Sequence, residues 1–116
     1  MSDELCELDL AEIQTAYGRR ELSPRELIAS SAARIEATEP LLNAYVTLCL
    51  DRAAGEAAEA ERRLAAGTGR LLEGIPFAVK DLFDTEGVRT TYGSRIYADH
   101  VPSTPPTRFA TRAEEG

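Results

Sequence analysis

The sequence predicts an α/β fold, with helices over residues 9–66 followed by a strand and loop region over residues 71–107. Before residue 66, apolar side chains recur at spacings of three and four, which is the period of a helix with one buried face. From residue 75 they alternate with a period of two, as in a strand. With 43% apolar and 28% charged residues, the 116-residue chain is typical of at most one globular domain.

Two capping signatures predict where the first helices begin. Asp9 is placed to cap a first helix, and Glu12 can reach back to it from the third helical position. Ser23 and Glu26 repeat this pattern for a second helix. Pro24 stands at the first position of that helix, where its missing N–H costs nothing.

The other helix limits follow from breakers and composition. Gly18 predicts the end of the first helix and Pro40 the end of the second. A third helix is predicted over residues 51–66, where seven of sixteen residues are alanine, which indicates close packing against another element. A last short helix is predicted from Thr107 to Glu115.

Two short strands are predicted, over residues 44–49 and 75–80. In the second strand Phe77 and Val79 lie on one face, so Lys80 lies on the other, which otherwise carries only small side chains. We therefore expect a cavity beside the lysine amine. A turn over residues 84–87 follows the strand.

Charge and composition exclude several classes of function. The net charge of −7 argues against a nucleic-acid or anionic-membrane surface, because both need clustered cations. No apolar run is long enough to span a membrane, and the acidic start is unlike a signal peptide, so we expect a cytoplasmic protein. Cys6 and Cys49 have no metal or redox spacing, and we expect no metal and no cofactor.

Lys80 is the only lysine in a chain with twelve arginines, and it directly follows an apolar run. Arginine stays protonated in proteins, whereas a buried lysine can lose its proton and act as a base. Position 80 is therefore the one cationic position that could also transfer protons. The alternative is a structural lysine that pairs with Asp81 or Asp84.

Three motifs around Lys80 resemble those of the amidase signature family, whose members are amide hydrolases with a Ser–cis-Ser–Lys triad. They are the run Gly74–Asp81 (GIPFAVKD), the turn residues that follow it, and the run Thr90–Ser94 (TTYGS). Upstream, the SPREL cap at Ser23 and the LNAYV run over residues 42–46 also resemble the family. The resemblance extends from about residue 10 to residue 116 and covers only the front part of a typical member.

The resemblance implies a fold and a role for Lys80. The fold is a large mixed sheet with helices on both faces, of which this chain would hold the N-terminal helices and first strands. Lys80 would be the general base, which accepts a proton relayed from the nucleophilic serine. That serine attacks the amide carbonyl and forms an acyl-serine. A lysine does this only when neutral, so the resemblance implies a buried amine.

The serine pair of the family lies in a Gly/Ser-rich loop that this chain does not contain. Its six serines are Ser2, Ser23, Ser30, Ser31, Ser94 and Ser103. Ser94 matches a substrate-side residue of the family rather than the nucleophile. We therefore expect a truncated, incomplete domain over residues 1–116 that is inactive alone.

Several alternatives remain open at this level. The substrate would be a small-molecule amide, cleaved either by a general amidase, which Tyr92 and Gly93 favour, or by the glutamine-dependent subunit of a tRNA amidotransferase. The chain could instead be a non-catalytic helical interaction module or an inactive truncated product, and a homo-oligomer is compatible with either. Asp81 could orient Lys80 or cap a turn, and His100 is expected to be a loop residue.

Overall fold

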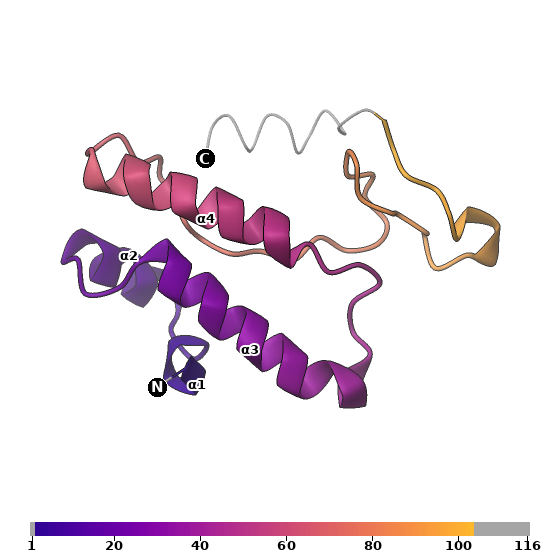
Figure 1. Ribbon diagram of the computed structural model, residues 1–116, viewed down its shortest axis with the longest axis horizontal. Coiled ribbons are helices and arrows are strands. Elements are labelled where there is room, and N and C mark those ends of the chain that lie inside the picture. The colour runs from indigo at the N-terminus through magenta and orange to yellow at the C-terminus, as the bar shows by residue number, and fades with distance from the viewer. Residues whose placement is uncertain (1, 104–116) are drawn as a thin grey trace. The chain divides into compact units, whose positions relative to one another are not determined.

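The computed structural model describes residues 2–103, which form two compact units. Among these residues, the helical unit comprises residues 2–44 and 50–76, and the loop unit comprises residues 45–49 and 77–103. All four α-helices of the described residues belong to the helical unit (Figure 1). Their bounds are Ser2–Leu5 for α1, Leu10–Gly18 for α2, Pro24–Leu42 for α3 and Leu50–Ala65 for α4.

Both predicted capping boxes are confirmed. At α2, the Glu12 amide donates to Asp9 Oδ1 and the Asp9 amide donates to Glu12 Oε2, each at 2.8 Å. At α3, the Ser23 amide donates to Glu26 Oε2 at 2.8 Å, and the Glu26 amide donates to Ser23 Oγ at 3.2 Å. These reciprocal bonds satisfy backbone donors that have no partner within the helix. Both starts are therefore decided by residues within three positions of each other.

The helix ends are confirmed except at Pro40. Helix α2 ends at Gly18, and α4 lies within one residue of its predicted range. Helix α3 runs through Pro40 and ends at Leu42, with Asn43 in the left-handed conformation at φ 47°. Pro40 lacks only its own N–H, so a single helical hydrogen bond is lost, the one to the carbonyl of residue 36, and the last turn can still form. Our prediction that Pro40 ends the helix was therefore wrong by two residues.

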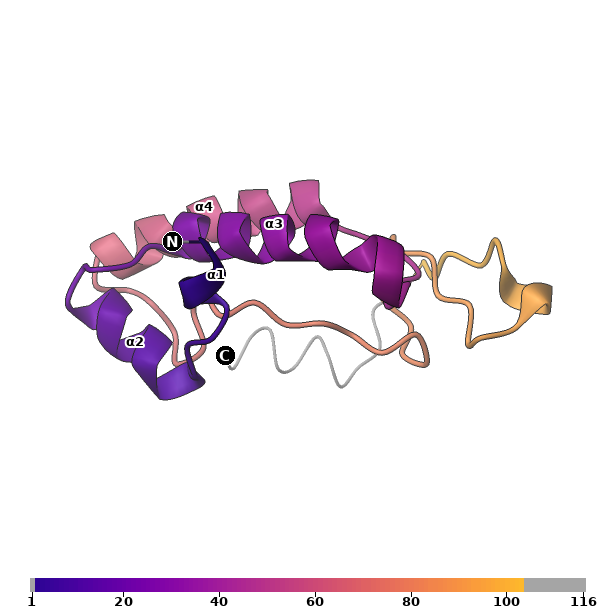
Figure 2. The ribbon, with the colours of Figure 1, turned by 90° about the horizontal axis from the view of Figure 1, so that it is seen from below.

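The core of the helical unit forms where α2 meets the start of α3. Its buried apolar side chains are Ile13, Tyr17, Leu22 and Leu27. Partly buried side chains from both ends of the unit pack against them, among them Leu5, Leu64 and Ile75. Helix α3 also packs against α1 and α4, and α3 and α4 lie side by side in both views (Figures 1 and 2).

The segment after α4 returns to this core and is fixed there by polar contacts. Glu73 is buried and accepts hydrogen bonds from Arg63 at 3.2 Å and from Arg70 Nε at 3.0 Å. Burial raises the pKa of the Glu73 carboxyl, but the bonds from Arg70 and Arg63 outweigh burial and leave this pKa below its usual value. The carboxylate therefore stays charged and holds the turn before Gly74.

Gly74 fits against the core in a way that only glycine permits. Its φ is +76°, and a Cβ there would lie 2.8 Å from Pro24 Cγ and 3.0 Å from Tyr17 Cε2. The Gly74 carbonyl accepts a hydrogen bond from the Tyr17 hydroxyl at 2.7 Å. The first residue of the GIPFAVKD run is thus in direct contact with the helical core.

The predicted strands are absent from the described residues. Residues 44–49 and 75–80 are irregular, and the only β-pairing among residues 2–103 is an isolated bridge between Thr85 and Val88. A strand needs a neighbour to satisfy its N–H and C=O groups, and no described segment supplies one. The described part of the chain is helical with irregular loops and does not show the sheet of the α/β prediction, which remains an expectation from the resemblance. The predicted helix over residues 107–115 lies outside the described residues.

Candidate functional site

Lys80 lies in the loop unit at the start of a tight turn. Its carbonyl accepts hydrogen bonds from the Leu82 amide at 2.7 Å and the Phe83 amide at 3.1 Å. The side chain is exposed, and among residues 2–103 it has no hydrogen-bond or ion-pair partner. The predicted cavity beside the amine is therefore not formed by the described residues, because the strand that would have shaped it is irregular. No ion pair between Lys80 and Asp81 or Asp84 is formed in this part of the chain.

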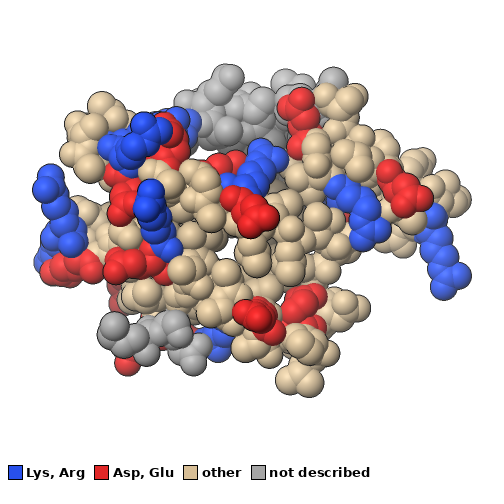
Figure 3. Space-filling view, viewed as in Figure 1, with Lys and Arg blue, Asp and Glu red and all other residues tan. Residues whose placement is uncertain are grey.

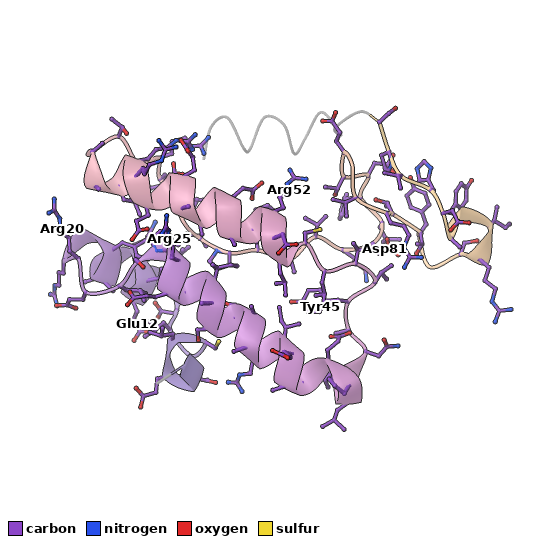
Figure 4. The ribbon with its side chains drawn as sticks, in the orientation of Figure 1. Glu12, Arg20, Arg25, Tyr45, Arg52 and Asp81 are labelled. Atoms are coloured by element: carbon purple, nitrogen blue, oxygen red, sulfur yellow. The ribbon has the colours of Figure 1, made fainter. Side chains whose placement is uncertain are left out.

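Asp81, directly after the lysine, is bound by the buried residue Thr91. The Thr91 amide donates to Asp81 Oδ1 at 2.7 Å, and the Thr91 hydroxyl donates to Asp81 Oδ2. These bonds, the hydroxyl first, hold the pKa of the Asp81 carboxyl below its usual value. Asp81 lies on irregular backbone of the loop unit (Figure 4). The two carboxylate oxygens are thus both engaged by one residue of the TTYGS run.

Asp84 is engaged by a second residue of the same run. It accepts a hydrogen bond from the Tyr92 hydroxyl, and its Oδ1 lies 3.7 Å from His100 Nε2. The bond to Asp84 is the main reason why the pKa of Tyr92 is raised to about 12. The Tyr92 ring packs edge-on against Tyr97 at 5.1 Å between ring centres and lies 5.8 Å from the His100 ring. His100, expected to be a plain loop residue, therefore belongs to a small aromatic cluster.

Backbone hydrogen bonds close the loop unit around these side chains. The Thr90 amide donates to the His100 carbonyl at 2.9 Å, and the Gly87 amide donates to the Pro102 carbonyl at 3.0 Å. Arg89 donates to the carbonyls of Ala98 and Val46 at 2.8 and 3.2 Å. The predicted turn over residues 84–87 is present as the Thr85–Val88 bridge. The loop unit is therefore organised by polar contacts, although it has little regular structure.

Four of the described serines lie within or cap helical elements. Ser23 caps α3, and Ser30 and Ser31 lie within it. Ser94 accepts a hydrogen bond from the Ile96 amide at 3.3 Å and caps the short 3-10 helix Arg95–Tyr97. Each has a structural role in this arrangement.

The helical unit carries a groove of a different kind. A groove of about 370 Å³ between α3 and α4 is lined mainly by alanine and carries one charged side chain, Arg25.

No group of three or more His, Cys, Asp or Glu side chains among residues 2–103 could hold a metal ion, and no helix there is long and apolar enough to cross a membrane. On the face shown in Figure 3, basic and acidic side chains are interspersed.

Comparison with known proteins assigns the family. Residues 26–114 match the sequence pattern of the amidase family, and this range includes Lys80, Asp81 and the TTYGS run. The chain is 43% identical over 113 residues to a glutamyl-tRNA(Gln) amidotransferase subunit from Geotalea daltonii, covering 97% of this chain and 23% of that protein. It is 42% identical over 113 residues to the protein of the same name from Pelobacter propionicus, with the same coverage.

A third relative, with the same name again, comes from Granulibacter bethesdensis. It is 46% identical over 98 residues, which make up 84% of this chain and 20% of that protein. The chain thus spans about a quarter of the length of the curated relatives that it matches. Because the family pattern covers most of the chain, the resemblance seen in its motifs is confirmed, and the protein belongs to the amidase signature family.

Proposed function

We propose that this chain is the N-terminal part of an amidase that cleaves a carbon–nitrogen bond through an acyl-serine, and that Lys80 is its general base. The observation that carries the proposal is the family match over residues 26–114, which includes the only lysine of the chain within the GIPFAVKD run. A neutral lysine can accept a proton, which none of the twelve arginines can do. Lys80 is therefore the one side chain here suited to the base of such a triad.

The proposed chemistry uses two serines from outside these 116 residues. The neutral Lys80 amine takes a proton from a bridging serine, which takes one from the nucleophilic serine. The nucleophile attacks the amide carbon, the C–N bond breaks, and the returning proton leaves with the amine. Water then hydrolyses the acyl-serine. The exposure of Lys80 and of neighbours such as Phe77 and Leu82 supports a site that the rest of the domain covers.

The names of the relatives support one particular amide as the substrate. Those described above are named as a subunit of glutamyl-tRNA(Gln) amidotransferase, and this name supports glutamine as the small-molecule amide. It argues against the general amidases that Tyr92 and Gly93 favour in the sequence. Such a subunit needs other chains, so we propose assembly with partner subunits rather than the homo-oligomer considered from sequence.

A chimaera tests this proposal. The 116 residues replace the corresponding part of the Geotalea daltonii relative, and ammonia release from glutamine is measured with the partner subunits present. Lys80→Arg keeps the positive charge but cannot act as a base, so we expect activity to fall by about 10²–10⁴-fold. Arg95→Met is the matched control, because it removes an exposed cation of the same unit.

The two variants separate the possible outcomes. Loss in Lys80→Arg together with near-normal activity in Arg95→Met supports the base assignment. Activity retained in Lys80→Arg contradicts it, and an inactive chimaera with an intact fold favours the alternative of an inactive product. A serine-directed covalent probe on the isolated chain should label nothing, and labelling that disappears in Ser94→Ala would overturn the assignment of Ser94 as a cap.

A further inference from the structure

We propose that Thr91 is a positioning residue, which binds the Asp81 carboxylate so that it cannot pair with the neighbouring Lys80 amine. The inference rests on the proposed function for the meaning of Lys80 as a base. Its geometric basis is independent of that function, because it concerns only which groups the two carboxylates near the lysine bind.

The contacts of Asp81 leave no carboxylate oxygen unoccupied. Oδ1 accepts from the Thr91 amide at 2.7 Å, and Oδ2 accepts from the Thr91 hydroxyl. Thr91 is only 8% exposed, and its neighbour Thr90 is 2% exposed, so the donor lies in a buried part of the loop unit. The Thr91 hydroxyl also accepts from the Gly93 amide at 3.3 Å, which orients it toward Asp81.

The next acid along the chain also binds other residues. Asp84 accepts from the Tyr92 hydroxyl and faces His100. Both carboxylates within four residues of Lys80 are thus bound by residues 91 and 92, and the Lys80 side chain has no partner among residues 2–103. The TTYGS run therefore acts on the lysine by occupying its nearest acids.

Pairing with a carboxylate would make Lys80 less able to act as a base. An ammonium paired with a carboxylate keeps its proton more firmly, because the opposite charge favours the protonated form. A free carboxylate one residue from the lysine could form such a pair. Binding Asp81 to Thr91 prevents the pairing without removing the carboxylate, which also fixes the turn after the lysine.

The single lysine allows this to be measured on the 116-residue chain. Acetylation of Lys80 by an N-hydroxysuccinimide ester reports how often the amine is neutral and free, and peptide mass mapping separates it from the N-terminal amine, which serves as the internal reference. In Thr91→Val the hydroxyl donor is lost. We expect Lys80 acetylation at pH 8 to slow about two- to fivefold, the range that an exposed ion pair supports.

A double substitution distinguishes slower acetylation caused by pairing of Lys80 with Asp81 from slower acetylation caused by loss of structure. Asp81→Asn alone should leave the rate within about twofold of the original, and Asp81→Asn combined with Thr91→Val should restore it, because no carboxylate remains to pair. Thr91→Ser keeps the hydroxyl and should behave as the original chain. An unchanged rate in Thr91→Val, or a double variant as slow as Thr91→Val, overturns the proposal.

A second pair of variants applies if Thr91→Val fails to fold. Asp81→Glu lengthens the side chain, so it cannot keep both bonds to Thr91 and can reach the lysine amine, while Asp81→Gln has the same size without charge. Slower acetylation in Asp81→Glu alone supports the proposal, and equal rates in the two contradict it. Because acetylation needs no hydrolysis, failure here is distinct from failure of the amidase proposal.

Discussion

The two halves of the GIPFAVKD run lie in different units and are held by different forces. Gly74 and Ile75 belong to the helical unit, where they contact the apolar core around Tyr17. Phe77 to Lys80 belong to the loop unit, and there Phe77 is 78% exposed. One continuous motif thus passes from a buried, apolar environment to an exposed one within three residues.

The comparison shows what each unit relies on. The helical unit combines local capping boxes with apolar burial, which is the main favourable contribution in folding. The loop unit relies on hydrogen bonds from Thr90, Thr91 and Arg89, while apolar side chains such as Ile96 stay exposed. We therefore expect substitutions at apolar positions to lower the free energy of unfolding in the helical unit and to change it little in the loop unit.

The largest effect should come from the core of the helical unit. Leu27 is 2% exposed, and Leu27→Ala should lower the free energy of unfolding by about 2–5 kcal/mol. Urea unfolding followed by helical circular dichroism measures it. Leu41→Ala, at an 88% exposed position of the same helix, is the control and should have little effect. Equal losses in the two would show that the helices lack a specific core.

The next largest effect should come from Gly74, where the GIPFAVKD run contacts the helical core. Gly74→Ala adds a Cβ that meets Pro24 and Tyr17 on a left-handed backbone. Strain and overpacking together should cost about 2–3 kcal/mol. Gly67→Ala is the matched control, since Gly67 has φ +74° but nothing within 4 Å of the added atom. It should cost only the backbone term of about 1–2 kcal/mol. Identical losses would contradict the close contact at Gly74.

A smaller effect concerns the hydrogen bond that ties the motif to α2. Tyr17→Phe removes the donor to the Gly74 carbonyl and should lower the free energy of unfolding by about 0.5–1.5 kcal/mol. Tyr97→Phe is the control, because it removes the hydroxyl of a 45% exposed tyrosine in the loop unit. A Tyr17→Phe protein as stable as the original at pH 7 would contradict this role.

The same tyrosine predicts a dependence on alkaline pH. Burial raises the pKa of Tyr17 to about 12, whereas its usual value is 10.0. The stabilisation is present below pH 10 and is lost as pH rises through about 12, because the unfolded phenol ionises first. The free energy of unfolding should therefore fall across this window, and Tyr17→Phe should make the fall shallower. Absorbance of the tyrosinate at rising pH checks the ionisation directly.

The smallest effect should come from the exposed half of the motif. Phe77→Ser replaces a 78% exposed side chain and should change the free energy of unfolding by less than about 0.5 kcal/mol. It should also reduce self-association, measured by light scattering, because it removes exposed apolar surface. A large destabilisation would mean that Phe77 is buried in solution and that the loop unit has an apolar core after all.

Prediction from sequence succeeded where the interactions are local. Asp9 with Glu12 and Ser23 with Glu26 lie three residues apart, so their capping boxes follow from spacing alone. It failed for residues 75–80, because alternation describes which way side chains would point in a strand but does not supply a neighbouring strand. Lys80 could be singled out as an unusual cation, and its family was confirmed, yet its exposure could not be predicted.

The contacts of Asp81 could not be predicted from the sequence either. The sequence left open whether this acid orients the lysine or caps a turn, because Thr91 lies ten residues away and nothing in the spacing joins them. A signal was present in the paired threonines of the TTYGS run, but only the structure shows that both are buried and that Thr91 donates to Asp81.

The starts of α2 and α3, the family and the one lysine suited to be a base could be predicted from the sequence. Those properties depend on residue type and short spacing. Only the tertiary structure decided that Gly74 contacts Tyr17, that Thr91 binds Asp81 and that Lys80 is left without a partner among residues 2–103. Such contacts join residues that are ten to more than fifty positions apart, and their formation depends on how the intervening chain folds.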